Sequence, residues 1–299
     1  MLATGKLMPD VITKKREFLD CLIGFEFSGI DTSGRRVMGF TESMAMSNIV
    51  SPNKLNVWPI PDEWSLEDAA TIPAVYFTVF YALYYYGTLR KGEKILIHAG
   101  SGGVGQAAIN IALSEGCEVF TTVGTPEKRR FIRETFPSIS DDHIGNSRDT
   151  SFEQMVMKLT NSKGVDIVLN SLAGEKLQAS VRCLAYRGRF LEMGKFDLAA
   201  NNQLGMEIFL KEISFHGILM DDMISGVAPH IQAEVHEFLK SKIYSKAIKP
   251  LNRKCFQKHE LEAAFRYMAA GKHIGKVNTP FLVFHKFNIT NFLNVSKKL

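Results

Sequence analysis

The sequence predicts an α/β protein built on a doubly wound parallel sheet, joined to a smaller, partial, β-rich part. Three observations lead to this prediction. From Lys94 to Gly217, short apolar runs alternate with segments of helical periodicity, the pattern of strands joined by helical crossovers. A glycine-rich turn directly follows the first apolar run. The first 68 residues instead carry short apolar runs broken by turn residues, which is typical of β-structure.

The composition is that of an ordinary soluble globular protein. The 299 residues include 36 basic and 31 acidic side chains, for a net charge of +5, with 45% hydrophobic and 22% charged residues. Such a balance excludes a disordered, a collagen-like or a disulfide-stapled chain. The basic residues are scattered among acids, so we expect no nucleic-acid partner.

The cysteines indicate neither a metal site nor a disulfide framework. Their separations of 96, 66 and 72 residues do not match zinc-ligand spacing. We therefore expect no metal, and free thiols in a reducing, cytoplasmic compartment. The four residues are Cys21, Cys117, Cys183 and Cys255.

The first elements are predicted from turn and capping signals. Residues 22–29 and 36–40 form a hairpin around the turn Asp31–Gly34, and the prolines keep 56–62 extended. Ser65–Asp68 has the spacing of a capping box and predicts the start of a helix.

The uncharged stretch 69–89 is long enough to span a membrane. Its tyrosines are spread along the stretch, whereas tyrosines of membrane spans gather at the interfaces. Tyr76, Phe80 and Tyr84 share one helix face, so we predict a buried helix that begins near Pro73, and no membrane.

The alternating region follows from Lys94. The predicted strands are 94–98, 118–123, 165–169, 188–193 and 212–217. The predicted helices are 104–114, 126–136, 152–159, 176–184, 232–242 and 258–268. After Val277 the sequence shows no clear period.

The turn after the first predicted strand fits G-x-G-x-x-G through Gly100, Gly102 and Gly105. The first glycine permits the tight turn, the second lets the backbone approach a pyrophosphate, and the third packs helix on strand. Because the motif lies between a strand and a helix, it predicts a Rossmann dinucleotide site. We expect the cofactor to contact Gly100, Ser101, Gly102, Gly103, Val104 and Gly105.

The second strand indicates NADP(H) rather than NAD(H). Glu118 starts that strand, whereas a carboxylate that holds the ribose hydroxyl belongs at its end. The strand ends in hydroxyls, including Thr122, and Lys128 follows, which suits a 2′-phosphate. Arg129 and Arg130 fit either a phosphate site or a solvated helix face.

Six segments together closely resemble the enoyl reductase region of animal fatty acid synthase, a zinc-independent member of the medium-chain dehydrogenase/reductase superfamily that is related to the corresponding polyketide synthase domain. The resemblance covers roughly residues 1–277. The segments are Ile97–Ala108 (IHAGSGGVGQAA), Val119–Gly124 (VFTTVG), Asn146–Glu153 (NSRDTSFE), Val168–Leu172 (VLNSL), Gly188–Asp197 (GRFLEMGKFD) and Phe265–Lys276 (FRYMAAGKHIGK).

The resemblance implies the activity, the cofactor and the partners. It implies NADPH-dependent reduction of a trans-2-enoyl thioester carried on an acyl carrier protein, during fatty acid biosynthesis, within a dimeric multienzyme. It also implies that the β-rich part is a GroES-like substrate domain. Part of the cluster Tyr84–Tyr86 then either belongs to the core, which we favour, or borders the acyl groove.

The resemblance also proposes site residues. Lys195 and Asp221 match the family's proton-donor candidates, and Lys195 follows a strand at the edge where cofactors bind. Lys128 matches a lysine near the adenosine phosphate, and Arg148 is a further phosphate contact. Asn170, with Ser171, is placed beside the nicotinamide ribose.

Two histidines, His98 and His216, end predicted strands. A histidine base could be argued there, but hydrogen-bonded structural histidines are favoured.

The resemblance divides the chain at 1–75 (partial substrate-binding domain), 76–221 (NADP-binding Rossmann domain) and 222–299 (end of the Rossmann domain and return to the substrate domain). Met1 aligns inside the family's substrate domain, so that domain is expected to lack its first strands. Pro280 is expected to interrupt the returning strand and to leave unpaired strand edges.

Two other functions stay open at this point. One is a stand-alone NADPH quinone or enone reductase of the same superfamily. The other is a non-catalytic, truncated nucleotide-binding fragment.

Overall fold

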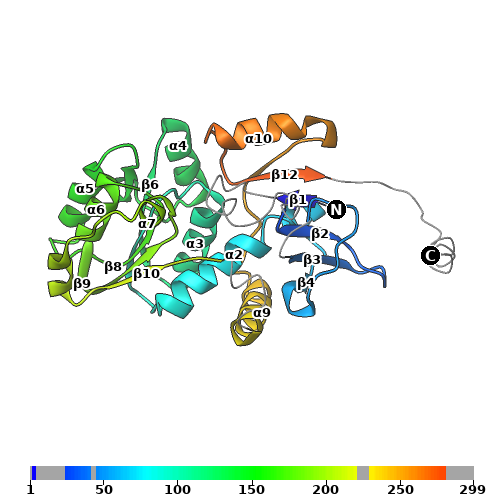
Figure 1. The fold of residues 1–299 in the computed structure, drawn as a ribbon, viewed down its shortest axis with the longest axis horizontal. Helices are drawn as coiled ribbons and strands as arrows, with labels where there is room; N and C mark the ends of the chain where they lie inside the picture. The colour runs from blue at the N-terminus through cyan, green and yellow to red at the C-terminus, as the bar shows by residue number, and fades with distance from the viewer. Residues whose placement is uncertain (1, 5–23, 42–44, 221–228, 281–299) are drawn as a thin grey trace.

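The structure of the protein is a computed structural model that describes residues 2–4, 24–41, 45–220 and 229–280. Two six-stranded sheets organise these residues. Figure 1 shows the parallel sheet with its helices on one side of the view and the smaller sheet on the other, with α2 and α9 between them.

The parallel sheet has the strand order β10-β9-β8-β5-β6-β7. Counted from β5, this is the 3-2-1-4-5-6 order of a doubly wound dinucleotide-binding fold. The predicted α/β class with a Rossmann sheet is therefore confirmed. The strands are β5 (Lys94–Ile97), β6 (Glu118–Val123), β7 (Ile144–Asn146), β8 (Val165–Asn170), β9 (Leu184–Glu192) and β10 (Ser214–Gly217).

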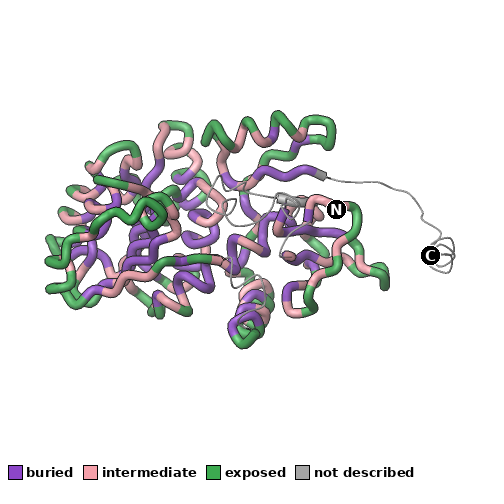
Figure 2. The backbone as a smooth tube through the Cα atoms, viewed as in Figure 1, coloured by how far each residue is buried: buried purple, intermediate pink, exposed green. Residues whose placement is uncertain are grey.

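Helices cover both faces of this sheet because its strands are apolar on both faces. Within β5, Ile95 and Ile97 pack into one core cluster and Leu96 packs into a second. Both clusters are buried, as the purple interior of Figure 2 shows. The helices around the sheet are α3 (Gly103–Ser114), α4 (Pro126–Thr135), α5 (Ser151–Leu159), α6 (Glu175–Arg182) and α7 (Phe196–Ala199), with short turns η4 (Asp141–His143) and η5 (Met206–Lys211).

The smaller sheet has the order β11-β12-β1-β2-β3-β4. Its predicted hairpin is confirmed: β2 and β3 pair around a turn in which the Asp31 carboxylate accepts the Ser33 and Arg35 backbone N–H groups at 2.9 Å. The strands are β1 (Leu2–Thr4), β2 (Glu26–Ile30), β3 (Arg36–Phe40), β4 (Val57–Pro59), β11 (Arg253–Cys255) and β12 (Lys276–Pro280), and η2 (Lys54–Asn56) precedes β4.

The returning strand β12 is part of this sheet. β12 runs through Asn278 to Pro280, and β1 lies between β12 and β2 and pairs with both. Pro280 is the last described residue of this strand. The interruption of the strand at Pro280 therefore stays a prediction.

The capping box and the uncharged helix are confirmed. The Ser65 side chain accepts the Asp68 backbone N–H at the start of α1 (Leu66–Ala69), and the Asp68 carboxylate accepts the Ser65 backbone N–H. Pro73 opens α2 (Pro73–Val79), which continues as the π-helix η3 (Phe80–Tyr86) and is largely buried. Within the described residues, no helix has the length and apolar character that crossing a membrane requires.

The chain then returns to the smaller sheet through α9 (Pro229–Tyr244), η6 (Lys258–Glu260) and α10 (Leu261–Ala269). β1, β7 and β11 were not predicted. Each has three residues, too few to show an alternating pattern. Among the described strands, β11 pairs with β12 alone, so it depends on that long-range pairing.

Candidate active site

The sheet order places the candidate site at the carboxyl ends of β5 and β8. These two strands are neighbours, and the chain leaves them toward opposite sides of the sheet. Ligands of doubly wound folds bind at such a switch point. The glycine turn follows β5, and Asn170 ends β8.

The glycine turn has the tight geometry that a dinucleotide cradle needs. A Cβ atom on Gly100 would lie 2.0 Å from Thr121 Oγ1, and one on Gly105 would lie 2.3 Å from the Ala99 carbonyl oxygen. Gly102 begins α3 with extended backbone, φ −78° and ψ 170°. Because Gly102 has no side chain to cap the helix, the first-turn N–H groups of α3 suit an anion. The turn therefore fits a dinucleotide pyrophosphate.

His98 lies beneath this turn as a structural residue. It is 1% exposed, with Nδ1 2.8 Å from Thr122 Oγ1 and Nε2 2.8 Å from Ser180 Oγ. Ser180 donates its own proton to the Lys176 carbonyl oxygen, so Nε2 donates to Ser180 and Nδ1 accepts from Thr122. Burial lowers the pKa of His98 to about 3. His98 is thus held neutral, as the structural alternative predicted.

Thr122 supports the glycine turn, and its predicted cofactor contact stays a prediction. Its hydroxyl is used by His98, and its side chain is fully buried. Its carbonyl oxygen accepts the Gly100 N–H at 3.1 Å, so Thr122 supports the glycine turn from below.

Two predicted phosphate residues lie together beyond the end of β6. Arg148 Nε donates to the Gly124 carbonyl oxygen at 3.3 Å, and Lys128 Nζ donates to the Gly271 carbonyl oxygen at 2.8 Å. Burial, and then the charge of Arg148, lower the pKa of Lys128. Two cations that repel one another in this way favour a bound anion between them.

The neighbouring charges do not belong to this pair. Arg129 turns away, toward Asp141 and the Ile144 carbonyl oxygen. Glu118 stays at the amino end of β6, where it contacts Lys94 and His143. The helix-face alternative therefore holds for Arg129, and Glu118 is at the wrong edge for a ribose contact.

Asn170 is fully buried, and its amide is committed to protein contacts. Nδ2 donates to the Leu172 carbonyl oxygen at 2.8 Å and to Glu192 Oε2 at 2.5 Å, while Oδ1 accepts the Leu172 N–H at 3.2 Å. Asn170 therefore shapes the turn that holds the exposed Ser171. A nicotinamide ribose contact of its side chain stays a prediction.

Of the proposed proton donors, Lys195 lies three residues beyond β9 and is the N-cap residue of α7. β9 lies beside β8, so Lys195 and the Asn170 turn share the same sheet edge. Asp221 lies outside the described residues.

The tyrosine cluster and His216 pack beside the sheet. Tyr81 Oη lies 3.1 Å from Tyr86 Oη, and Tyr84 donates to Glu115 Oε1 at 2.6 Å. The Tyr86 ring lies 5.0 Å from the His216 ring. Within the cluster Tyr84–Tyr86, Tyr84 and Tyr86 are partly buried and pack against the core, whereas Tyr85 is 40% exposed.

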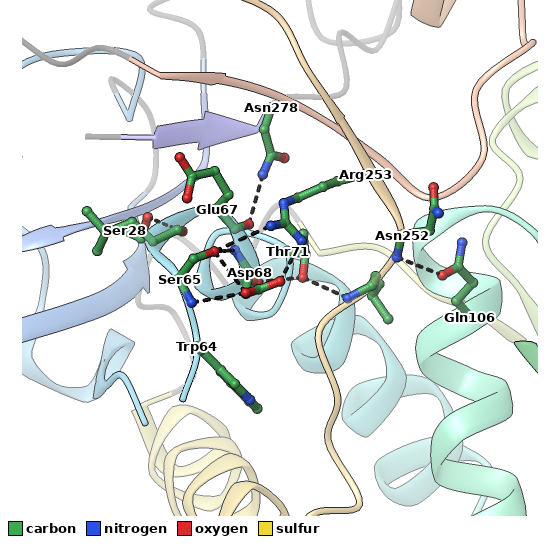
Figure 3. Close-up of polar contacts among 12 residues, drawn as sticks. Ser28, Trp64, Ser65, Glu67, Asp68, Thr71, Gln106, Asn252, Arg253 and Asn278 are labelled. Atoms are coloured by element: carbon green, nitrogen blue, oxygen red, sulfur yellow. Dashed lines mark hydrogen bonds and ion pairs between the residues drawn. The ribbon is translucent and has the colours of Figure 1, made fainter. Parts of the chain in front are cut away.

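Sequence reasoning missed Gln106, which connects the glycine turn to the returning chain. Its Nε2 donates to the Ser101 carbonyl oxygen at 2.8 Å, and the Gly275 N–H donates to the same oxygen at 2.8 Å. Figure 3 shows Gln106 on α3 receiving the Asn252 backbone N–H. A glutamine on the buried face of an apolar helix was the available signal.

The same view contains polar contacts that join α1 to the returning strands β11 and β12 of the smaller sheet. Arg253 pairs with the Asp68 carboxylate at 2.5 Å, and Asn278 donates to the Glu67 carbonyl oxygen at 3.0 Å (Figure 3). The short helix α1 is thereby fixed to the returning strands.

Comparisons with known proteins agree with this geometry. Residues 103–240 match the family model "Zinc-binding dehydrogenase". Within the part of the chain that the structure describes, no cluster of three His, Cys, Asp or Glu residues could hold a metal ion.

The chain is similar to domains of large synthases. It is 38% identical over 286 residues to the highly reducing polyketide synthase phiA of a fungal species, covering 92% of this chain but 11% of that protein. The chain thus spans about a tenth of the length of that curated relative.

Solved structures match over most of their length. The CurK enoyl reductase is 33% identical with a TM-score of 0.76, over 87% of this chain and 79% of that one. The JamJ enoyl reductase (apo form) is 30% identical with a TM-score of 0.79, over 93% and 88%.

These similarities correct one prediction and support another. The phiA relative is a polyketide synthase, so the narrower resemblance to animal fatty acid synthase is not supported. Enoyl reductase domains of polyketide synthases use NADPH, which agrees with the predicted cofactor. The chain belongs to the enoyl reductase family of the medium-chain dehydrogenase/reductase superfamily.

Proposed function

We propose that this chain reduces the 2,3 double bond of a trans-2-enoyl thioester carried on an acyl carrier protein, as the enoyl reductase of a polyketide-synthase-type multienzyme. The observation that carries the proposal is the shared sheet edge of the glycine turn, the Asn170 turn and Lys195. The similarity to the CurK and JamJ enoyl reductases supports it.

The chain's own residues would hold the cofactor in three places. The N–H groups of the first turn of α3 hold the pyrophosphate, as the uncapped Gly102 favours. Lys128 and Arg148 hold the 2′-phosphate beyond β6. The exposed Ser171 contacts the nicotinamide ribose.

When bound, NADPH supplies a hydride to the β-carbon of the enoyl group. Negative charge then develops on the thioester oxygen, and a proton must reach the α-carbon to give the saturated thioester and NADP⁺. An ammonium group at this edge both stabilises that charge and supplies the proton, and we assign this role to Lys195. Asp221 is the second proposed donor.

The test is steady-state oxidation of NADPH with a trans-2-enoyl pantetheine thioester, compared with a free quinone. We expect turnover of the thioester. Turnover of the quinone alone would instead favour a quinone reductase, and NADPH binding without turnover of either acceptor would favour a non-catalytic fragment.

The proton-donor assignment is tested with Lys195→Ala. We expect kcat to fall by about 100-fold, the scale typical for loss of a general acid. The control is Lys211→Ala, because Lys211 donates to the Leu184 carbonyl oxygen at the start of β9, away from the proposed site. Undiminished activity of Lys195→Ala would contradict the role.

A further inference from the structure

Glu192 is a buried carboxyl group at the proposed catalytic edge. It is the last residue of β9 and its surface is 0% exposed. Its position follows an apolar run in which Phe190 and Leu191 are also fully buried. Burying a carboxyl group costs free energy unless hydrogen bonds replace its water.

The two oxygens of Glu192 hold two different turns. Oε2 accepts Asn170 Nδ2 at 2.5 Å, at the end of β8, and Oε1 accepts the Gly194 N–H at 2.5 Å, just after β9. The contact with Gly194 is close, since a Cβ there would lie 2.6 Å from Oε1. Lys195 is the next residue along the chain.

We propose that Glu192 is a positioning residue, which locks the Gly194–Lys195 turn against the Asn170 turn and thereby sets where the Lys195 ammonium stands. The inference rests on the proposed function, because it is Lys195 to which we assign the proton. Glu192 itself touches neither substrate nor cofactor in this role. A misplacement of about 1 Å can cost about 100-fold in rate, so one buried carboxyl group is enough to matter.

The charges around Glu192 make this lock depend on pH. Burial raises its pKa to about 7, the Asn170 and Gly194 donors oppose that rise, and the charge of Asp197 adds to it. From the segment after β10, the Ile218 backbone N–H donates to the backbone carbonyl oxygen of Glu192, not to its carboxyl group. Asp197 lies on α7, whose N-cap residue is Lys195.

The direction of the pH dependence follows from the hydrogen bonds. Both contacts to the Glu192 carboxyl group are N–H donors, so the ionised carboxylate accepts both. Protonation turns one of its oxygens into an O–H donor, which accepts less well from the facing N–H. As the pH falls through about 7, the lock weakens and kcat falls with it.

A reciprocal exchange tests the lock. Glu192→Gln presents an amide NH2 to the Asn170 NH2, so we expect kcat to fall by about 10- to 100-fold while KM for NADPH changes little. The fall of kcat below about pH 7, called here the acid limb, should also disappear. Adding Asn170→Asp restores a donor–acceptor pair, so the double variant should recover much of the lost kcat, whereas Asn170→Asp alone should not. Glu118→Gln, at the opposite edge of the sheet, is the matched control and should leave kcat unchanged.

A second measurement does not depend on turnover. Amide hydrogen exchange at Gly194 and Lys195 should accelerate at least about tenfold in Glu192→Gln relative to the unaltered protein at the same pH. If Glu192→Gln keeps the exchange rates, or keeps both kcat and the acid limb, the positioning role is overturned. If the exchange changes but the unaltered protein reduces no enoyl thioester, the lock stands and the proposed function fails.

Discussion

Gln106 and Asn252 meet through a side chain–backbone hydrogen bond of 3.2 Å that joins the first turn of the nucleotide-side helix α3 to the returning chain. The other end of the Gln106 amide holds the Ser101 carbonyl oxygen inside the glycine turn. One buried amide therefore ties the proposed cofactor cradle to the segment that leads back into the smaller sheet.

We expect Gln106→Leu to lose both bonds and to leave the Asn252 N–H without its acceptor. The free energy of unfolding should fall by about 1–3 kcal/mol, as for other buried groups left unsatisfied. NADPH should also bind more weakly, because the Ser101 carbonyl oxygen keeps only its bond from the Gly275 N–H and the glycine turn is held less firmly. Chemical denaturation and fluorescence titration measure the two effects. Gln178→Leu, which removes an exposed contact to the Gln203 carbonyl oxygen, should change neither.

Substitutions at two glycines should distinguish an effect on stability from an effect on cofactor binding. Gly100→Ala places a Cβ 2.0 Å from Thr121 Oγ1, so we expect a loss of about 1–3 kcal/mol of stability. In Gly102→Ala the nearest atom, the Ala99 carbonyl oxygen, lies 3.2 Å away, and the backbone angles suit alanine. We therefore expect Gly102→Ala to keep its stability within about 1 kcal/mol but to bind NADPH more weakly. Unchanged NADPH affinity would contradict the cradle.

Lys128 and Arg148 should distinguish NADPH from NADH. Lys128→Ala removes a charged donor worth about 1.5–3 kcal/mol, so the Kd for NADPH should rise about 10- to 100-fold while that for NADH changes little. Arg148→Ala should act in the same direction. The exposed Arg130, on the same helix as Lys128, serves as the control. Equal weakening of both cofactors would show that Lys128 acts only through its bond to Gly271.

His98 should make the protein sensitive to acid. Its pKa is about 3 when folded and 6.5 as a free side chain, so below pH 6.5 the unfolded chain binds a proton that the folded protein does not. Stability should therefore fall as the pH is lowered below about 6.5, by at most about 1.4 kcal/mol per pH unit from this group.

His98→Gln tests this linkage in urea titrations at several pH values. The variant should be less stable near neutral pH, because it loses part of the Thr122–Ser180 network, but its stability should vary less between pH 6.5 and 4. His230→Gln, at an exposed position, should retain the full acid dependence. The same acid dependence in His98→Gln would assign it to other groups.

Local signals in the sequence predicted the elements and the cradle. The alternating apolar runs predicted the strands and helices of the parallel sheet, because period and length are properties of each segment by itself. The Asp31 turn, the Ser65 capping box and the G-x-G-x-x-G turn were also predicted, since each is completed within a few residues. NADPH as the cofactor followed from the same turn and from the end of β6.

Only the tertiary structure decided what distant residues do together. The side chains of Thr122 and Asn170 contact His98 and Glu192, which lie 24 and 22 positions away in the chain. Gln106 reaches a backbone group 146 positions away. The pairing of β1 with β12 likewise depends on a register between the two ends of the described chain. A side chain's burial and its long-range hydrogen bonds arise only when strands and loops far apart in the sequence are brought into contact, so no local pattern could reveal them.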